Sequence, residues 1–262
     1  MLHWSLLQSD AFWGSSESDF LHTIAPAVAK GWERGTRRGE FSWLNKEGVS
    51  EAEFFRSVGD GIDALYRSRA GGRRWVDQTP FYVSVAGHLA KMFPTARFLC
   101  LFRDGRQATP SIQALLGHGF DDAAFEWTRA CGQALELMQN LPDRCLPVCF
   151  EDLILHTEEA LKDIFRFLEE PFADRAVAFI REKSPINSLF EEESSLDKLT
   201  PRWLDWSRRQ RKRFHRIGGG MLQVLGYVPD DDWVRHPSSP DNVAVARRVR
   251  DTLEELRGSG PG

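Results

Sequence analysis

A short apolar run that ends in a polar turn constrains this chain more than any other feature. Residues 98–102 are continuously apolar, a length and composition typical of a strand buried on both faces of a parallel sheet. The run stops at Arg103, and Asp104 and Gly105 then give a turn signal. Apolar residues at helical spacing resume over 112–116. We therefore expect a strand, a turn and a helix, the arrangement at which open parallel sheets bind ligands.

Two starting points of this helix fit the sequence. Thr109 and Pro110 suit an N-cap and a first helical residue, which places Ser111 in the first turn. A start near Gly105 instead leaves Pro110 inside the helix at some cost in stability. Either way, Arg103 and Ser111 flank one turn, where a guanidinium, a hydroxyl and free helical N–H groups suit a phosphate. The alternative is that Arg103 pairs with the adjacent aspartate or another carboxylate and only ends the strand.

Strand and helix signals alternate along the chain, which predicts an α/β fold with a parallel sheet of three to five strands and helices on both faces. We expect a single domain over 1–262 with a partly flexible tail over 236–262. The expected strands and helices follow, with the expected irregular segments last: strands over 74–77, 98–102 and 145–150; helices over 51–69, 81–93, 121–140, 157–168, 172–182 and 206–225, the last one broken at 218–220; a loop over 31–49 and a mobile segment over 184–201.

Composition excludes several classes of protein. With 262 residues and 42% hydrophobic content, the chain can bury a substantial core. A net charge of −4 argues against nonspecific nucleic-acid binding. The four cysteines lack a Cys-x-x-Cys spacing, which favours buried reduced thiols and a cytoplasmic protein over a disulfide framework or zinc site. No stretch is long enough to span a bilayer, and no signal peptide is evident.

Six fragments, in order over roughly residues 1–230, resemble sulfotransferases that use 3′-phosphoadenosine 5′-phosphosulfate (PAPS). Arg103 closes a strand and Ser111 follows eight residues later, as in the family's 3′-phosphate-binding motif. The family usually has Pro where this chain has Gly105. The other fragments are the acidic stretch 13–21, the Asp-Gln-Thr-Pro sequence 77–80, the strand end 150–153, the helix 164–168 and the Leu-Gly-Tyr sequence 225–227.

The resemblance implies a P-loop-like three-layer fold with a central parallel sheet, and transfer of a sulfuryl group from PAPS to a small-molecule hydroxyl or amine. It implies Arg103 and Ser111 as contacts to the donor nucleotide, Glu17 as catalytic base, and Gln78 and Thr79 as substrate contacts. It implies no metal, no nucleic-acid partner and no membrane insertion. The alternative is that Glu17 only caps the helix that follows it. His3 and His22 are the alternative bases.

Three departures from the family affect the expected activity, and the first is the most serious. The family's Gly-rich loop, whose backbone N–H groups hold the 5′-phosphosulfate, precedes the position at which this sequence begins. We therefore expect an N-terminally incomplete domain. A mis-assigned start codon, a truncation or a gene that has lost the activity would each explain this. We expect weak or no turnover by these 262 residues. Gln78 replaces the family's Lys, and no Arg-Lys-Gly segment is visible. Arg181, Lys183 or the basic run 208–213 are candidate replacements, although a solvated helix face also explains that run.

Two other functions remain open. A nucleotide-binding or interaction protein without catalysis fits the missing loop and Gln78. A phosphoryl-transfer enzyme of the P-loop class requires a Walker lysine, which this sequence does not show.

Overall fold

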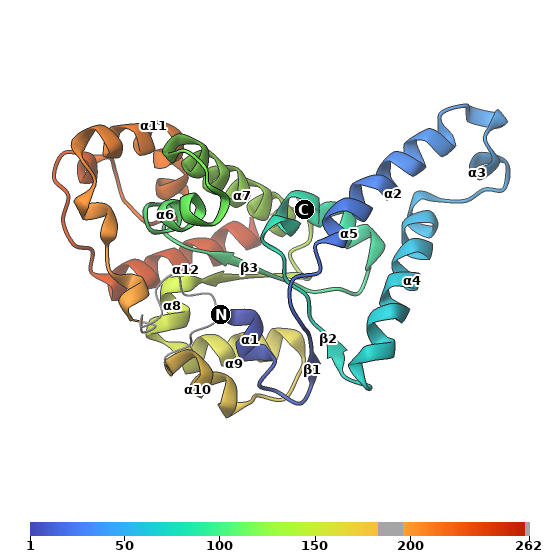
Figure 1. Cartoon of the computed structure of the whole chain (residues 1–262), viewed down its shortest axis with the longest axis horizontal. Helices are drawn as coiled ribbons and strands as arrows, with labels where there is room; N and C mark the ends of the chain where they lie inside the picture. Colours follow the sequence, from blue (N-terminus) through green and yellow to red (C-terminus); the bar gives the residue numbers. More distant parts are fainter. Residues whose placement is uncertain (183–195, 260–262) are drawn as a thin grey trace. The chain divides into compact units, whose positions relative to one another are not determined.

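Strands β3 (Phe98–Phe102) and β4 (Cys145–Cys149) form a parallel pair in the computed structural model of the chain (Figure 1). The structure describes residues 1–182 and 196–259. Cys100 is buried, whereas Leu101, whose side chain points to the opposite face, is 47% exposed. The prediction that this strand is buried on both faces is therefore wrong, because only one face of β3 is fully covered.

The chain divides into two compact units. One comprises Met1–Ser5 and Arg97–Gly262, and the other comprises Leu6–Ala96. The first unit contains the pair β3–β4, and the second contains a separate parallel pair, β1 (Phe12–Trp13) with β2 (Arg74–Trp75).

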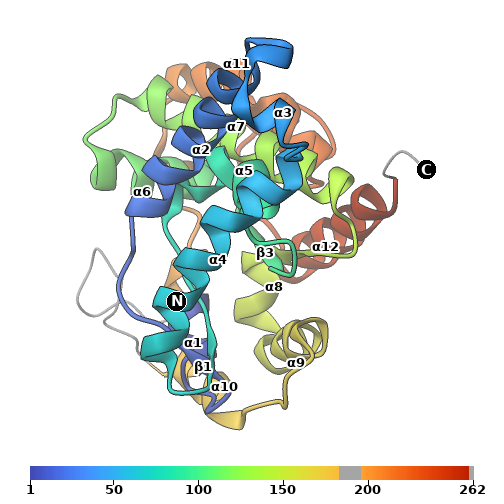
Figure 2. The ribbon, with the colours of Figure 1, turned by 90° about the vertical axis from the view of Figure 1, so that its right-hand side faces the viewer.

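Helices make up most of the first unit. Three of them, α7, α9 and α12, pack against β4, and α12 also lies beside α8 (Figure 1 and Figure 2). Three-residue and four-residue 3₁₀ helices connect several of the longer elements. The elements are α6 (Gly105–Leu116), α7 (Phe120–Asn140), α8 (Phe150–Leu155), α9 (Thr157–Leu168), α10 (Asp174–Arg181), η3 (Asp197–Leu199), η4 (Arg202–Asp205), α11 (Arg208–Val224), η5 (Asp232–Val234) and α12 (Asn242–Gly258).

Apolar residues at helical spacing produce these packed helices. In α9, Leu161, Ile164, Phe165 and Leu168 recur every three or four residues and are buried. The predictions of helices over 121–140 and 157–168 are confirmed. All four cysteines are buried and free, as predicted for reduced thiols.

Helix α11 continues through its three glycines. A Cβ added at Gly218 would lie 3.1 Å from Trp127 and from Thr128 of α7, so the missing side chain lets the two helices approach closely. The prediction of a break at 218–220 is wrong, because here glycine serves helix packing instead of ending the helix. Of the segment 184–201, residues 184–195 lie outside the described part, and η3 lies within the remainder.

The second unit is also mostly helical. Its predicted helix over 51–69 is present as α4, with Ser50 as N-cap and Gly71 in the left-handed conformation at the C-cap. The predicted loop over 31–49 is wrong in part, because α2 extends to Thr36 and two short helices follow. The elements are α1 (Leu2–Leu6, which begins in the first unit), α2 (Phe20–Thr36), η1 (Gly39–Phe41), α3 (Trp43–Lys46), α4 (Glu51–Ala70), η2 (Pro80–Val85) and α5 (Ala86–Met92).

The fold is mostly helical α/β with parallel strands. Among the described residues there are two sheets of two strands each, so the prediction of one sheet with three to five strands is wrong. The strand predicted over 74–77 has only two paired residues, and its partner is β1, which begins at Phe12. A strand of two residues carries no alternating pattern, so the sequence gives no sign of this pairing.

Candidate functional site

Arg103 follows β3 directly, at the edge where the carboxyl ends of the parallel strands β3 and β4 meet. Its guanidinium lies over the ring of Phe150, the first residue of α8, with the carbon of the guanidinium 4.6 Å from the ring centroid. The Trp127 indole N–H donates to the Arg103 carbonyl oxygen at 3.0 Å. Both the backbone and the side chain of Arg103 are therefore held in place.

Glu151 fixes the turn that follows Arg103. Its Oε1 accepts a hydrogen bond from the Asp104 backbone N–H at 3.0 Å. Its Oε2 accepts from the Cys149 thiol at 3.3 Å and from the Tyr227 hydroxyl at 3.1 Å. Burial raises the pKa of the Glu151 carboxyl, and burial followed by the Glu151 charge raises the pKa of Tyr227. The sequence offers one signal for this role, a carboxylate directly after an apolar strand.

Asp104 begins helix α6 and pairs with Arg106. Its Oδ1 accepts from the Arg106 backbone N–H at 2.9 Å, and its Oδ2 lies 2.6 Å from Arg106 Nη2. Both side chains are buried, and the Arg106 guanidinium lies 4.1 Å from the Trp203 ring centroid. Asp104 therefore forms a buried ion pair with Arg106, whose role is structural. A Cβ at Gly105 would lie 2.5 Å from the Trp127 ring, which explains glycine at this position.

Ser111 lies in the second turn of α6, because the helix starts at Gly105 with Pro110 inside it. The start at Thr109 is therefore wrong, and the Thr109 hydroxyl instead donates to the Gly105 carbonyl at 2.7 Å. Six residues of helix place Ser111 about 9 Å along the axis from Gly105, on the same face as Gln107. Arg103 and Ser111 stay on one strand–turn–helix segment, but Ser111 is not in the first turn.

Gln107 joins Arg103 in binding backbone oxygen atoms of residues 198–200. Arg103 Nη2 donates to the Lys198 carbonyl at 2.9 Å. Gln107 Nε2 donates to the Thr200 carbonyl at 2.8 Å and to that of Leu199 at 3.3 Å. Beside this segment lies a cavity of about 10 Å³, lined in part by Gln107 and Lys198, which has room for about one water molecule. No sequence pattern indicates Gln107 as a site residue.

Glu17 and Gln78 lie together in the second unit. Because β1 and β2 are parallel, the loops that follow them leave the same edge, and Gln78 Nε2 donates to Glu17 Oε1 at 3.2 Å. Glu17 is exposed and precedes α2, whose N-cap is Asp19. The alternative that Glu17 caps this helix therefore does not hold.

Asp77 is the centre of a hydrogen-bonded group next to these residues. Its Oδ2 accepts from the hydroxyls of Tyr66 at 2.9 Å and Tyr82 at 2.8 Å, and the Ser18 hydroxyl lies 2.5 Å from that of Tyr66. Burial raises the pKa of both tyrosines, so they stay protonated donors near neutral pH. Thr79 is buried, and its carbonyl accepts from the Tyr82 N–H at 3.0 Å. No sequence pattern indicates the two tyrosines as site residues.

The two alternative bases have different surroundings. His22, in the first turn of α2, has its Nε2 3.3 Å from the Ser84 hydroxyl. His3 is buried in α1, with its ring edge-on to Trp4 at 5.2 Å between centroids.

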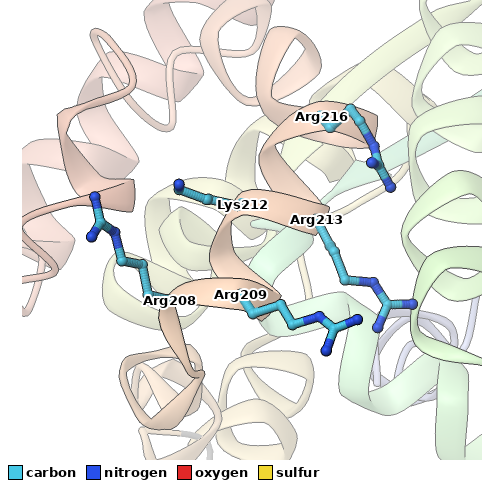
Figure 3. A pocket seen from close by; sticks show the side chains of 5 residues that line it. All are labelled: Arg208, Arg209, Lys212, Arg213 and Arg216. Atoms are coloured by element: carbon cyan, nitrogen blue, oxygen red, sulfur yellow. The ribbon is translucent and has the colours of Figure 1, made fainter.

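The cations that were candidates for replacing the family's lysine and Arg-Lys-Gly segment lie outside this turn. Arg181 on α10 lies 4.0 Å from Glu158, and Lys183 lies outside the described residues. The basic run forms part of α11, where five side chains line an open cavity of about 380 Å³ (Figure 3).

The described ranges contain neither a metal-binding cluster nor a membrane-spanning helix. No group of three or more His, Cys, Asp or Glu in 1–182 and 196–259 could hold a metal ion. Within those ranges, every helix is too short or too polar to cross a bilayer.

Known proteins resemble this chain in sequence. A sequence model of the sulfotransferase family matches residues 13–174. Protein-tyrosine sulfotransferase 1 of Danio rerio is 31% identical over 201 residues, which cover 70% of this chain and 55% of that protein. A protein-tyrosine sulfotransferase of Drosophila melanogaster is 28% identical over 204 residues, 71% of this chain and 40% of that protein. The chain spans about half the length of the curated relatives it matches.

Two solved structures share the fold. The sulfotransferase domain of the Synechococcus PCC 7002 olefin synthase has a TM-score of 0.58 and 17% identity, covering 84% of this chain and 89% of that domain. The sulfotransferase domain of the curacin biosynthetic pathway has a TM-score of 0.51 and 14% identity, covering 84% of this chain and 92% of that domain.

Proposed function

The chain belongs to the sulfotransferase family, and from this premise we propose that it transfers a sulfuryl group from PAPS to a hydroxyl or amine of a small molecule. The observation that carries the proposal is the family match over residues 13–174, which includes the turn after β3 and the Glu17–Gln78 pair. The shared fold with two sulfotransferase domains supports a P-loop-like arrangement of strands and helices around the site.

We assign Arg103 and Ser111 to the 3′-phosphate of the donor nucleotide. The residues present fit an anionic oxygen ligand, because Arg103 and Gln107 already donate to carbonyl oxygens of residues 198–200. A guanidinium binds phosphate oxygens more strongly than neutral carbonyls, since the hydrogen bonds are charge-assisted on both sides. Phosphate binding to Arg103 then competes with the contact to Lys198.

We assign the proton transfer to Glu17. In sulfuryl transfer the acceptor oxygen forms a bond to sulfur, the bond from sulfur to the nucleotide phosphate breaks, and the acceptor loses its proton to a base. Gln78 donates to Glu17 Oε1, which leaves Oε2 for the acceptor hydroxyl. Gln78 and Thr79 are our proposed substrate contacts, and no step requires a metal ligand from this chain.

A second acceptor class is favoured by a specific observation. The Danio rerio relative, 31% identical, is named for protein tyrosine, so a tyrosine side chain of a protein is the alternative acceptor. The two structural neighbours belong to a synthase and a biosynthetic pathway, which fits the small-molecule acceptor we propose first.

Transfer of labelled sulfate tests the function. The chain is incubated with ³⁵S-labelled PAPS and either a panel of hydroxylated and amino small molecules or tyrosine-containing peptides. We expect slow incorporation into a member of the small-molecule panel. Incorporation into peptides alone would move the acceptor to the second class.

Nucleotide binding without sulfuryl transfer would distinguish the remaining function, that of a nucleotide-binding protein without catalysis. If adenosine 3′,5′-bisphosphate binds but neither panel is labelled, the chain acts as a nucleotide-binding protein without catalysis. If neither binding nor transfer occurs, both assignments fail.

A further inference from the structure

Helix α11 carries a concentration of positive charge to which the proposed sulfuryl transfer assigns no role. Its 17 residues include six Arg or Lys and no Asp or Glu, in a chain of net charge −4. Five of these cations line the cavity of about 380 Å³ (Figure 3). They are Arg208, Arg209, Lys212, Arg213 and Arg216.

The five side chains share one side of the helix. At 100° per residue they fall within an arc of about 140°, with i, i+4 neighbours such as Arg208 and Lys212. In the view of Figure 3, Arg209, Arg213 and Arg216 extend to the right of the helix, and Arg208 and Lys212 extend to the left. The sixth cation, Arg211, instead donates to the Val234 carbonyl at 3.1 Å.

This arrangement is unfavourable for the chain alone. Arg208 and Arg209 lie in the first turn, where the helix dipole is positive. Like charges four residues apart also repel. Only Arg213 has an ion-pair partner among the described residues, Asp121 at 2.9 Å. The other four cations are exposed, and no ion pair within 4.0 Å joins any of them to a carboxylate of the described residues. Asp121, whose pKa is lowered chiefly by its hydrogen bond to Arg213, also feels the charge of Arg216.

The lining of the cavity restricts the ligand. Among the described residues, only the five cations line it. The Phe120 ring centroid lies 5.7 Å from the guanidinium carbon of Arg213 but the ring does not line the cavity, which therefore lacks the stacking surface of a nucleobase site and the buried anchor typical of protein docking. The described part of the chain adds no apolar side chain to this lining that could enter a membrane interface. Its volume is at the low end of small-ligand sites. Arginine pairs best with phosphate and sulfate oxygens, because its N–H groups can bind two of them at once.

We propose that this face of α11, which we call the basic face, binds a small oligoanion of linked phosphate or sulfate groups without an apolar part. The proposal stands independently of the proposed sulfuryl transfer. Binding removes the repulsion among the cations, so the oligoanion stabilises the folded chain.

Titration calorimetry with inorganic tripolyphosphate tests the proposal, using wild type, Arg209→Gln/Lys212→Gln, and the matched control Arg235→Gln/Arg247→Gln. The control removes two exposed cations outside α11, so the two double variants have the same net charge as each other. We expect the α11 variant to bind at least about tenfold more weakly and the control to stay within about twofold of wild type. Repeating the titration with a fully sulfated disaccharide shows which of the two groups binds more tightly.

Thermal unfolding gives a second measurement that needs no ligand. At low salt, Arg209→Gln/Lys212→Gln should raise the melting temperature and lose the further increase that tripolyphosphate gives wild type. Equal loss of affinity in both double variants would overturn the proposal, because it would show nonspecific attraction. Tighter binding of a poly-glutamate peptide or a DNA oligonucleotide than of tripolyphosphate would overturn the ligand class.

Discussion

The Glu17 side chain is exposed, and a hydrogen bond orients its carboxylate. It lies in the loop between β1 and α2, and Gln78 donates to its Oε1 at 3.2 Å. Gln78 directs the carboxylate through a neutral hydrogen bond, whereas the family's lysine would add a positive charge. A neutral partner leaves the carboxylate free to accept a proton, which is the property a general base requires.

Replacing Glu17 by glutamine should lower the turnover number by about 10²- to 10⁴-fold, because the amide cannot accept the acceptor's proton. The affinity for adenosine 3′,5′-bisphosphate should stay within about twofold of wild type. Steady-state kinetics with labelled PAPS and calorimetry measure the two quantities. The matched control is Glu33→Gln, an exposed carboxylate on α2. Unchanged turnover in Glu17→Gln would assign the base elsewhere, with His22 the next candidate.

The start of α6 depends on a buried ion pair. Replacing Asp104 by alanine should lower the free energy of unfolding by about 3–5 kcal/mol, because Arg106 is left buried without its partner. The double variant Asp104→Ala/Arg106→Met should lose less than Asp104→Ala alone, since neither charge of the buried pair remains. Urea denaturation of the two variants and Arg106→Met measures the coupling. If the losses in free energy of unfolding of the two single variants add up to the loss of the double variant, the ion pair contributes little.

Glu151 makes the same turn sensitive to pH. Burial raises the pKa of its carboxyl above the ordinary value of 4.5, so the protonated form is favoured in the folded state. The resulting stabilisation is complete below 4.5 and is lost as pH rises through the folded-state pKa. Relative to Glu151→Gln, wild type should therefore lose stability as the pH rises above 4.5, as measured by the urea midpoint. A constant difference between the two proteins over this range would contradict the prediction.

Elements with a strong helical period were predictable from sequence. Helices α4, α7 and α9 appear close to their expected bounds, because their apolar residues repeat every three or four positions. Strand β1 was not predictable, since two paired residues have no period. The partners of Gln107 were not predictable either, because they lie 92 or more positions away in the chain. The same holds for two partners of Glu151, the Asp104 N–H and the Tyr227 hydroxyl, which lie 47 and 76 positions away.

At the scale of the whole molecule, the family was accessible from sequence because six fragments occur in the family's order. The residues proposed for the nucleotide, Arg103 and Ser111, lie in the unit of Arg97–Gly262. Glu17, Gln78 and Thr79 lie in the unit of Leu6–Ala96. Binding of the nucleotide therefore tests the first unit's role without depending on the base.

The central claim is that the turn after β3 binds the 3′-phosphate of the sulfuryl donor. Calorimetry with adenosine 3′,5′-bisphosphate tests it most directly, on wild type, Arg103→Ala and the control Arg166→Ala, an exposed arginine of α9. We predict that Arg103→Ala weakens binding by about 1.5–3 kcal/mol, roughly one to two orders of magnitude in Kd, and that the control matches wild type. Equal affinity of wild type and Arg103→Ala, with both proteins folded, would contradict the claim.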